Sequence, residues 1–348
     1  MEFIENINVE LKRYYQILSK EIPDFIQEYA GVPAMLRLQG ISMLPGTDWT
    51  NIFHNRFFNA RLNHSIGVAL IIWNFTKDKK QTLAGLFHDI ASPAFSHVLD
   101  FIHGDYQKQE STEDLTRNMI ENSPELRALL QRDQIEVEDI CDYHKYPVAD
   151  NDTPMLSADR LEYTFSDLLE LNLITLEQIE SIYQDLTILY NEKQEIELGF
   201  KHEKEAEQFV EKANLLWKII SGGNEFNLVM QFWTDFLKKL ADKHYITEAD
   251  LYVLSEEQLV QKIKQYEDKS LVEVFQKFQE SDTIGRSEEP IEGSYCISIT
   301  GKRRYINPLV VTQKENKRIT QVSKESKEII ESILQYKDTK YAYLPFDF

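Results

Sequence analysis

The chain has 348 residues, of which 42% are hydrophobic and 11% aromatic, so it can bury the core of a globular protein. Its formal net charge of −20 argues against non-specific binding to nucleic acids, because phosphate backbones are held by basic surfaces. Two isolated cysteines, no signal-peptide pattern and no apolar run of membrane-spanning length together predict a cytoplasmic protein without a membrane partner.

Helical periodicity and a scarcity of glycine characterise the chain up to about residue 280. In residues 61–76 the apolar side chains cover one helical face and spread around it, which predicts a central helix with little surface left for water. A shorter helix is expected over residues 81–90, before Pro93, and the Asn-Asp-Thr-Pro stretch at 151–154 introduces the helix that carries Asp159. Further helices are expected from about residue 111 and over residues 175–190, 202–220, 228–242, 256–266 and 270–279.

The pattern changes after Gly285, where β-branched and aromatic residues replace the helical period. The sequence predicts a mainly α protein, in which a helical body of residues 1–280 carries a small α+β appendage of residues 281–348. All strands are expected in that appendage. The strands are expected at residues 295–299, 304–307 and 309–312, and a last helix at residues 324–335.

Four residues within these expected helices have side chains that bind divalent metals: His64, His88, Asp89 and Asp159. Two imidazoles and two carboxylates suit a cation that is neither very soft nor very hard, so Mn, Fe, Ni, Co, Zn and Mg are all candidates. A single buried histidine is more often a hydrogen-bonded core residue than a ligand. Asp89 is different, since a carboxylate among apolar neighbours carries a large desolvation penalty unless a cation accompanies it.

The helix that follows Pro154 has a polar face that bears on function. At 100° per residue, Tyr163, Asp167 and Arg160 fall within one arc of about 100° that starts at Asp159. The apolar side chains occupy the opposite side. This arc has two interpretations, one wall of a functional site or the solvated face of a surface helix.

Three segments resemble, in order and spacing, the motifs of the HD-domain phosphohydrolases, and in particular the branch of deoxynucleoside triphosphate triphosphohydrolases. They are Arg61-Leu62-Asn63-His64-Ser65-Ile66-Gly67-Val68, His88-Asp89 with the downstream Phe95-Ser96-His97, and Asp159-Arg160-Leu161-Glu162-Tyr163. Further matches lie at residues 38–46 and 302–310. The resemblance spans most of residues 35–340, and the core motif region covers about 35–175.

The resemblance implies an HD-domain helical bundle with one divalent metal ion, and a metal-dependent phosphohydrolase that acts on a nucleotide or a related phosphoester. Members of this branch commonly form symmetric oligomers, so a homo-oligomer is one assembly that it implies. Placed on this sequence, it implies His64, His88, Asp89 and Asp159 as metal ligands, Arg61, His97 and Arg160 as phosphate-binding residues, and Gln39, Tyr163 and Asp167 as sugar-binding residues.

The chain departs from the branch at its proton-transfer residues. Where the branch has a second histidine after His-Asp, this chain has Ser92, and where the branch has a His-Glu pair, this chain has Gln109 and Glu110. Neither serine nor glutamine replaces an imidazole that titrates near neutral pH, which leaves Glu110 as a catalytic candidate. His54, His103 or His144 could act as the base in place of the missing histidines, but each could also be a structural or a solvent-exposed residue.

Two functions therefore stay open, beside a structural role or unrelated chemistry on the same scaffold. One is a working phosphohydrolase with altered proton-transfer residues, since a metal ion can itself activate water and stabilise phosphoryl charge. The alternative is a catalytically weak or inactive HD-domain protein that binds nucleotides and has a regulatory role. Metal that is retained without turnover would favour the alternative.

Overall fold

A computed structural model describes residues 7–96, 98–99, 115–220, 222–299, 301 and 303–348. Three residues with expected roles, His97, Gln109 and Glu110, lie outside this described part, as do His103 and the start of the helix expected from residue 111. None of the described helices is both long and apolar enough to cross a membrane.

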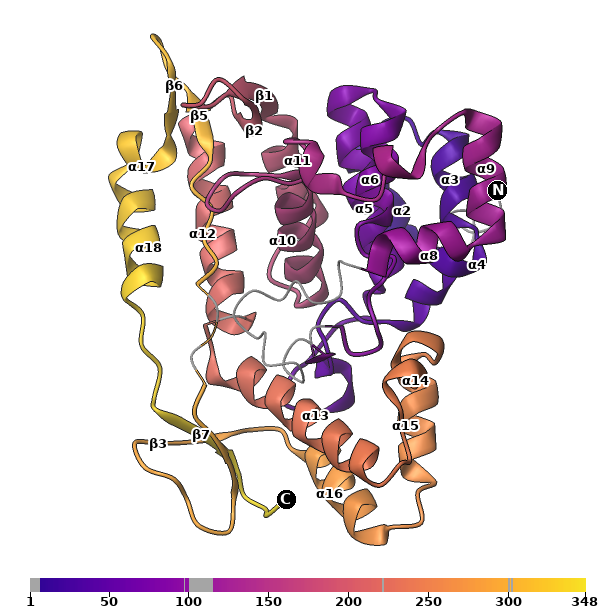
Figure 1. Ribbon diagram of the computed structural model, residues 1–348. Coiled ribbons are helices and arrows are strands. Elements are labelled where there is room, and N and C mark those ends of the chain that lie inside the picture. Colours follow the sequence, from indigo (N-terminus) through magenta and orange to yellow (C-terminus); the bar gives the residue numbers. More distant parts are fainter. Residues whose placement is uncertain (1–6, 97, 100–114, 221, 300, 302) are drawn as a thin grey trace.

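Helix α5 (Arg61–Thr76) is the central element of the helical body, as its apolar pattern predicts. Most of its side chains are buried, and it packs against α2 (Val9–Leu18), α6 (Lys79–Phe87) and α10 (Ala158–Glu170) (Figure 1). Lys77, in the left-handed conformation, ends α5, and the Asp78 carboxylate accepts hydrogen bonds from the first backbone N–H groups of α6. This tight connection brings the end of α6 back beside α5.

The helices predicted after residue 200 are confirmed with bounds shifted by a few residues. Besides α2, α5, α6 and α10, the described helices are, in chain order, α3 (Asp24–Ala30), α4 (Pro33–Leu36), η1 (Arg37–Gly40), η2 (Thr47–Trp49), α8 (Thr116–Asn122), α9 (Pro124–Asp133), η4 (Val137–Asp139), η5 (Tyr143–Lys145), α11 (Leu176–Gln184), α12 (Glu203–Ile220), α13 (Asn224–Asp242), α14 (Glu248–Val253), α15 (Glu256–Lys264), α16 (Lys269–Glu280), α17 (Ile319–Val322) and α18 (Lys324–Gln335).

The expectation that all strands lie after residue 280 is wrong. The helix expected over residues 175–190 ends at Gln184, and β1 (Leu186–Tyr190) pairs antiparallel with β2 (Ile196–Phe200). The Asn191 side chain accepts backbone hydrogen bonds from within the intervening turn, which closes the hairpin. The hairpin belongs to a four-stranded sheet, β1-β2-β5-β6, completed by β5 (Leu309–Val311) and β6 (Asn316–Arg318).

A second, three-stranded sheet has the order β3-β7-β4 and is antiparallel throughout. Its strands are β3 (Gly285–Ser287), β4 (Tyr295–Ile297) and β7 (Tyr341–Leu344). The strand expected at residues 304–307 is not formed. That segment connects the two sheets without strand pairing in its described residues.

Buried apolar side chains form two clusters. One contains side chains of α5, α10, α12 and the four-stranded sheet, and the other contains side chains of α13, α15, α16, β4 and β7. Residues after 280 contribute to both clusters. The division into a helical body of residues 1–280 and an appendage of residues 281–348 stays a prediction. Phe95, just beyond His88-Asp89, stacks on Trp233 of α13 at 4.0 Å between ring centroids, so the metal-ligand segment contacts the second cluster.

Candidate metal centre

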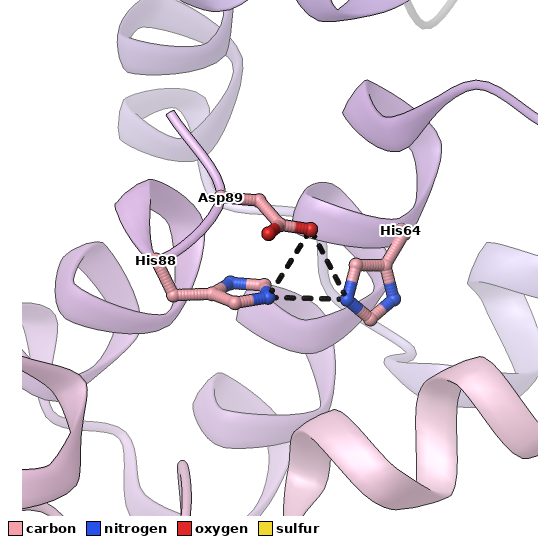
Figure 2. Close-up of side chains that lie close together, drawn as sticks. All are labelled: His64, His88 and Asp89. Atoms are coloured by element: carbon pink, nitrogen blue, oxygen red, sulfur yellow. Dashed lines mark hydrogen bonds and ion pairs between the residues drawn. The ribbon is translucent and has the colours of Figure 1, made fainter. Parts of the chain in front are cut away.

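Three elements bring the four predicted ligands together. His64 lies in the first turns of α5, and His88 and Asp89 directly follow α6 (Figure 2). The helix expected over residues 81–90 thus ends at Phe87, before both ligands. Asp159 lies in the first turn of α10. The Nε2 atoms of His64 and His88 are 3.1 Å apart, and Asp89 Oδ2 lies 3.8 Å and 3.5 Å from them, respectively. Asp159 Oδ1 lies 3.1 Å from His64 Nε2 and 3.5 Å from His88 Nε2.

The hydrogen bonds behind the two imidazoles fit a shared cation. His64 Nδ1 lies 2.5 Å from Glu162 Oε2, and His88 Nδ1 lies 2.7 Å from the carbonyl oxygen of Gly85. Acceptors at both Nδ1 atoms assign the ring protons there and leave both Nε2 lone pairs directed towards the carboxylates. Two such lone pairs this close repel each other unless positive charge lies between them, and a divalent cation supplies it.

The electrostatics of the centre point the same way. Although burial disfavours a charged ring, Glu162 and Asp159 raise the pKa of His64 to about 10. Burial likewise opposes charge on Asp89, yet Arg61 and the two histidines hold its pKa well below the usual range of a carboxyl group. Without a metal, a protonated His64 and Arg61 thus balance the negative charge of the carboxylates, and a bound divalent cation would take the place of the His64 proton.

Close packing of two helices sets the position of His64. A Cβ atom at Gly67 of α5 would lie 2.5 Å from Glu162 Oε1, so only glycine leaves room for this carboxylate against α5. Glu162 is 1% exposed and accepts hydrogen bonds from Tyr14 and Ser166, at 3.0 Å and 3.1 Å. Its role was not predicted from the sequence, although its place one turn after Asp159 was a signal.

The two predicted phosphate-binding arginines are buried beside the metal centre and bonded to protein acceptors. Arg61 binds Asp89 Oδ2 at 2.5 Å and Ser96 Oγ at 2.6 Å. Arg160 binds Asp150 Oδ1 at 2.6 Å and also donates to the carbonyl oxygen of Asn151. A guanidinium group has five N–H donors, so both arginines retain donors for a ligand.

A pocket of about 670 Å³ opens over the metal centre. Its lining contains the four metal ligands and, of the other predicted site residues described, Arg61, Arg160, Tyr163 and Asp167. Gln39 lies exposed on η1 and is not among the lining residues. Lining residues to which the sequence assigned no role include Asp150, Lys193, Trp217, Arg303 and Arg304.

The basic side chains of this pocket come from segments far apart in the chain. Arg303 and Arg304 are the second and third residues of the segment 302–310, one of the segments that resemble the HD-domain phosphohydrolases. The Arg304 guanidinium lies 6.0 Å from the centre of the Tyr163 ring. The adjacent arginines were the available sequence signal, but only the folded chain shows that they reach the metal pocket. Together with Arg61, Arg160 and Lys193, these arginines place positive charge beside the carboxylates of the pocket lining.

Asp167 lies farther along α10 in the same pocket. Its side chain is buried, and Oδ1 has no hydrogen-bond partner among the described residues. Burial, together with the charge of Glu162, raises the pKa of Asp167 to about 7. A buried oxygen without a partner in a pocket wall is available to a hydroxyl group of a ligand.

Comparison with known proteins agrees with this geometry. Residues 61–176, which contain all four candidate ligands, match the family model of the HD domain. The chain is 31% identical over 136 residues to the uncharacterized protein YdhJ of Bacillus subtilis, covering 38% of this chain and 41% of YdhJ. It is 23% identical over 155 residues to the metal-dependent phosphohydrolase cns2 of Cordyceps militaris, covering 43% of this chain and 42% of cns2.

These matches span less than half the length of either curated relative. A solved structure, that of a hypothetical protein from Aquifex aeolicus, superimposes with a TM-score of 0.64 over 93% of both chains. Its sequence identity of 17% supports similarity of fold alone.

Proposed function

We propose that this protein is a metal-dependent phosphohydrolase that acts on a small phosphoester, a nucleotide or a related compound. The observation that carries the proposal is the convergence of His64, His88, Asp89 and Asp159 in the wall of a pocket whose lining also contains several arginines. Similarity to cns2, named a metal-dependent phosphohydrolase, supports the same class of reaction.

The four ligands would hold one divalent cation, which when bound supplies charge to polarise a phosphoester and acidify water. Arg61 and Arg160 would direct their remaining N–H groups at the phosphate oxygens, a task that suits a planar guanidinium group. Arg303 and Arg304 add positive charge from the opposite end of the chain. These residues bind and orient the anionic group within a protein whose net charge would otherwise repel it.

A nucleotide is the substrate that best uses the rest of the pocket. The Tyr163 ring offers an apolar surface for a sugar, and Asp167 offers an unpartnered oxygen for a sugar hydroxyl. This proposal follows the resemblance to the deoxynucleoside triphosphate triphosphohydrolases. Gln39 lies outside the described lining, so the sugar contacts we propose are those of Tyr163 and Asp167.

A specific observation favours the second function, nucleotide binding without turnover. Ser92 Oγ donates a hydrogen bond to Asp89 Oδ1 at 3.1 Å, so this hydroxyl supports a metal ligand. A serine hydroxyl does not ionise near neutral pH as a histidine imidazole does, so Ser92 cannot serve as the acid or base of a turnover step.

The deciding experiment loads the purified protein in turn with Mn, Fe, Ni, Co, Zn and Mg and screens nucleotides and generic phosphoesters. Metal-dependent release of a phosphate-containing product, lost in Asp89→Ala, would establish the phosphohydrolase. Tight binding of metal and nucleotide without any product would establish the second function. Failure of the wild-type protein to bind any of these metals would reject both.

A further inference from the structure

We infer that His144 is the general acid of phosphoester cleavage in this pocket. The inference rests on the proposed function and adds to it a proton donor for the leaving group. Among the described residues that line the pocket, three are histidines: His64, His88 and His144. The first two direct Nε2 at the metal centre, so His144 is the imidazole in this lining that is available for proton transfer.

The start of a short 3-10 helix orients the His144 ring. Asp142 caps η5, and its Oδ1 accepts the backbone N–H of His144 at 3.1 Å and lies 3.2 Å from His144 Nδ1. One carboxylate oxygen therefore holds both the backbone and one edge of the ring. The opposite ring nitrogen, Nε2, lies 3.4 Å from Asp150 Oδ2, a second lining residue.

His144 is connected to the metal centre along two routes. The preceding residue, Tyr143, packs on the ring of His88 with centroids 4.9 Å apart and the planes inclined by 33°. On the other side, Asp150 binds Arg160, the residue that follows the ligand Asp159, at 2.6 Å. These contacts place His144 in the wall of the same pocket as the candidate metal ligands.

The exposure of His144 suits a group that must reach a substrate. Its side chain is 51% exposed, whereas the two ligand imidazoles are almost completely buried. A purely structural histidine in a cap would need only the Asp142 contact. The second carboxylate, Asp150, is 12% exposed and also holds Arg160, so it joins the proposed proton donor to a proposed phosphate-binding group.

The proposed step balances without any further reactant. A water oxygen forms a bond to phosphorus as the bond between phosphorus and the leaving oxygen breaks. The proton on His144 Nε2 passes to that leaving oxygen, and the proton released by the attacking water restores the imidazolium ion. A phosphomonoester gives an alcohol and inorganic phosphate. A nucleotide gives two products, one from each side of the phosphorus–oxygen bond that breaks.

The test compares His144→Gln with the wild-type protein on aryl and alkyl phosphates. An alkoxide leaving group needs a proton in the transition state, whereas p-nitrophenolate leaves without one. We expect the rate on alkyl phosphates to fall by about 10²-fold or more, the usual effect of a general acid. The rate on p-nitrophenyl phosphate should fall by much less, and Mn²⁺ affinity, measured by calorimetry, should not change.

A second measurement uses whichever phosphoester the wild-type protein cleaves, nucleotides included. Added imidazole should restore much of the activity of His144→Ala, because a free proton donor can occupy the space vacated by the ring. His202→Gln is the matched control, since His202 is also paired with a carboxylate, Asp185, but lies outside the pocket lining. It should behave as the wild-type protein does.

The outcomes separate this inference from the proposed function. If the wild-type protein cleaves phosphoesters but imidazole fails to rescue His144→Ala, the assignment of His144 is overturned and the proposed function stands. Equal losses on aryl and alkyl esters in His144→Gln would also overturn it. If the wild-type protein binds metal and cleaves no phosphoester, the proposed function fails and the assignment of His144 fails with it.

Discussion

Glu162 is the residue on which the orientation of His64 depends. It accepts the Nδ1 proton of His64 from a position that is closed to water and is itself held by Tyr14 and Ser166. Carboxylates in this position fix the tautomer of a metal-binding histidine and increase its basicity. The metal affinity of this centre therefore depends on a residue that does not contact the metal.

Replacing Glu162 with Gln should weaken Mn²⁺ binding by about 10–100-fold, because the amide keeps the shape but loses the charge that favours the Nδ1 tautomer. Isothermal titration calorimetry on the purified variant measures this directly. Glu177→Gln, which changes an exposed acid in the same way, is the control and should leave the affinity unchanged. Wild-type affinity in Glu162→Gln would show that the His64 tautomer does not depend on this charge.

Asp167 predicts a pH dependence of stability. Its pKa in the folded protein, about 7, exceeds the ordinary value of 3.8, so the folded state holds the proton more tightly than the unfolded state does. The free energy of unfolding should therefore fall as pH rises from about 4 to 7, and the full loss should persist above that interval.

Asp167→Asn removes this ionisation and should stabilise the metal-free protein at pH 8 relative to the wild type, by on the order of 1–3 kcal/mol. The advantage should shrink towards pH 4.5. Urea denaturation at both pH values measures the difference, and Asp242→Asn, on the exposed end of α13, is the control. An advantage that is the same at both pH values would contradict the assigned titration.

At the residue scale, the sequence singles out four candidate metal ligands that the fold brings together, because charged groups at apolar helical positions stand out in the pattern. Glu162, Asp150 and the adjacent arginines could not be assigned this way. Their roles arise from contacts between segments that are distant in the chain, such as Arg304 beside Tyr163. No local period encodes such a contact.

At the scale of elements, the sheet and the ligand helix α10 share a buried ion pair. Arg318 on β6 binds Glu197 on β2 through two hydrogen bonds, at 2.6 Å and 2.9 Å, and Glu197 is fully buried. Glu197 also accepts the backbone N–H of Leu156, just before the start of α10. This pair therefore ties the four-stranded sheet to the segment that introduces Asp159.

Replacing Arg318 with Met should destabilise the protein by about 3–5 kcal/mol, because it leaves the Glu197 charge buried without a partner. Lys317→Met changes an exposed neighbour on the same strand and should have little effect. Chemical denaturation measures both variants. Adding Glu197→Gln to Arg318→Met should recover part of the loss, and a mild effect of Arg318→Met alone would mean that water reaches Glu197.

The misassigned segment at residues 186–190 shows what an apolar pattern leaves undecided. Leu-Thr-Ile-Leu-Tyr continues the preceding helical pattern, but its β-branched residues and the following turn also suit a strand. Pairing with residues 196–200, and through them with residues 309–311, decides in favour of the strand. The helices after residue 200, by contrast, have long amphipathic patterns and N-terminal capping residues that a sequence reveals.

At the scale of the whole molecule, the metal should stabilise the fold, because its ligands come from three separate segments of the helical body. Saturation with Mn²⁺ at about 100 times its dissociation constant should add about 2.7 kcal/mol, seen as a rise in Tm by calorimetry. A chelator should reverse the rise. Asp89→Ala should show none of it, and an equal rise in that variant would place the stabilising metal elsewhere.

The parallel pairing of β2 with β5 has a consequence for the growing chain. All four metal ligands and the β1-β2 hairpin are synthesised long before β5 and the arginines that precede it. A nascent chain on the ribosome therefore contains every ligand for the cation while one wall of its pocket has yet to be translated. During translation, the residues that would bind the cation are therefore complete before Arg303 and Arg304, whose charge would attract the substrate phosphate.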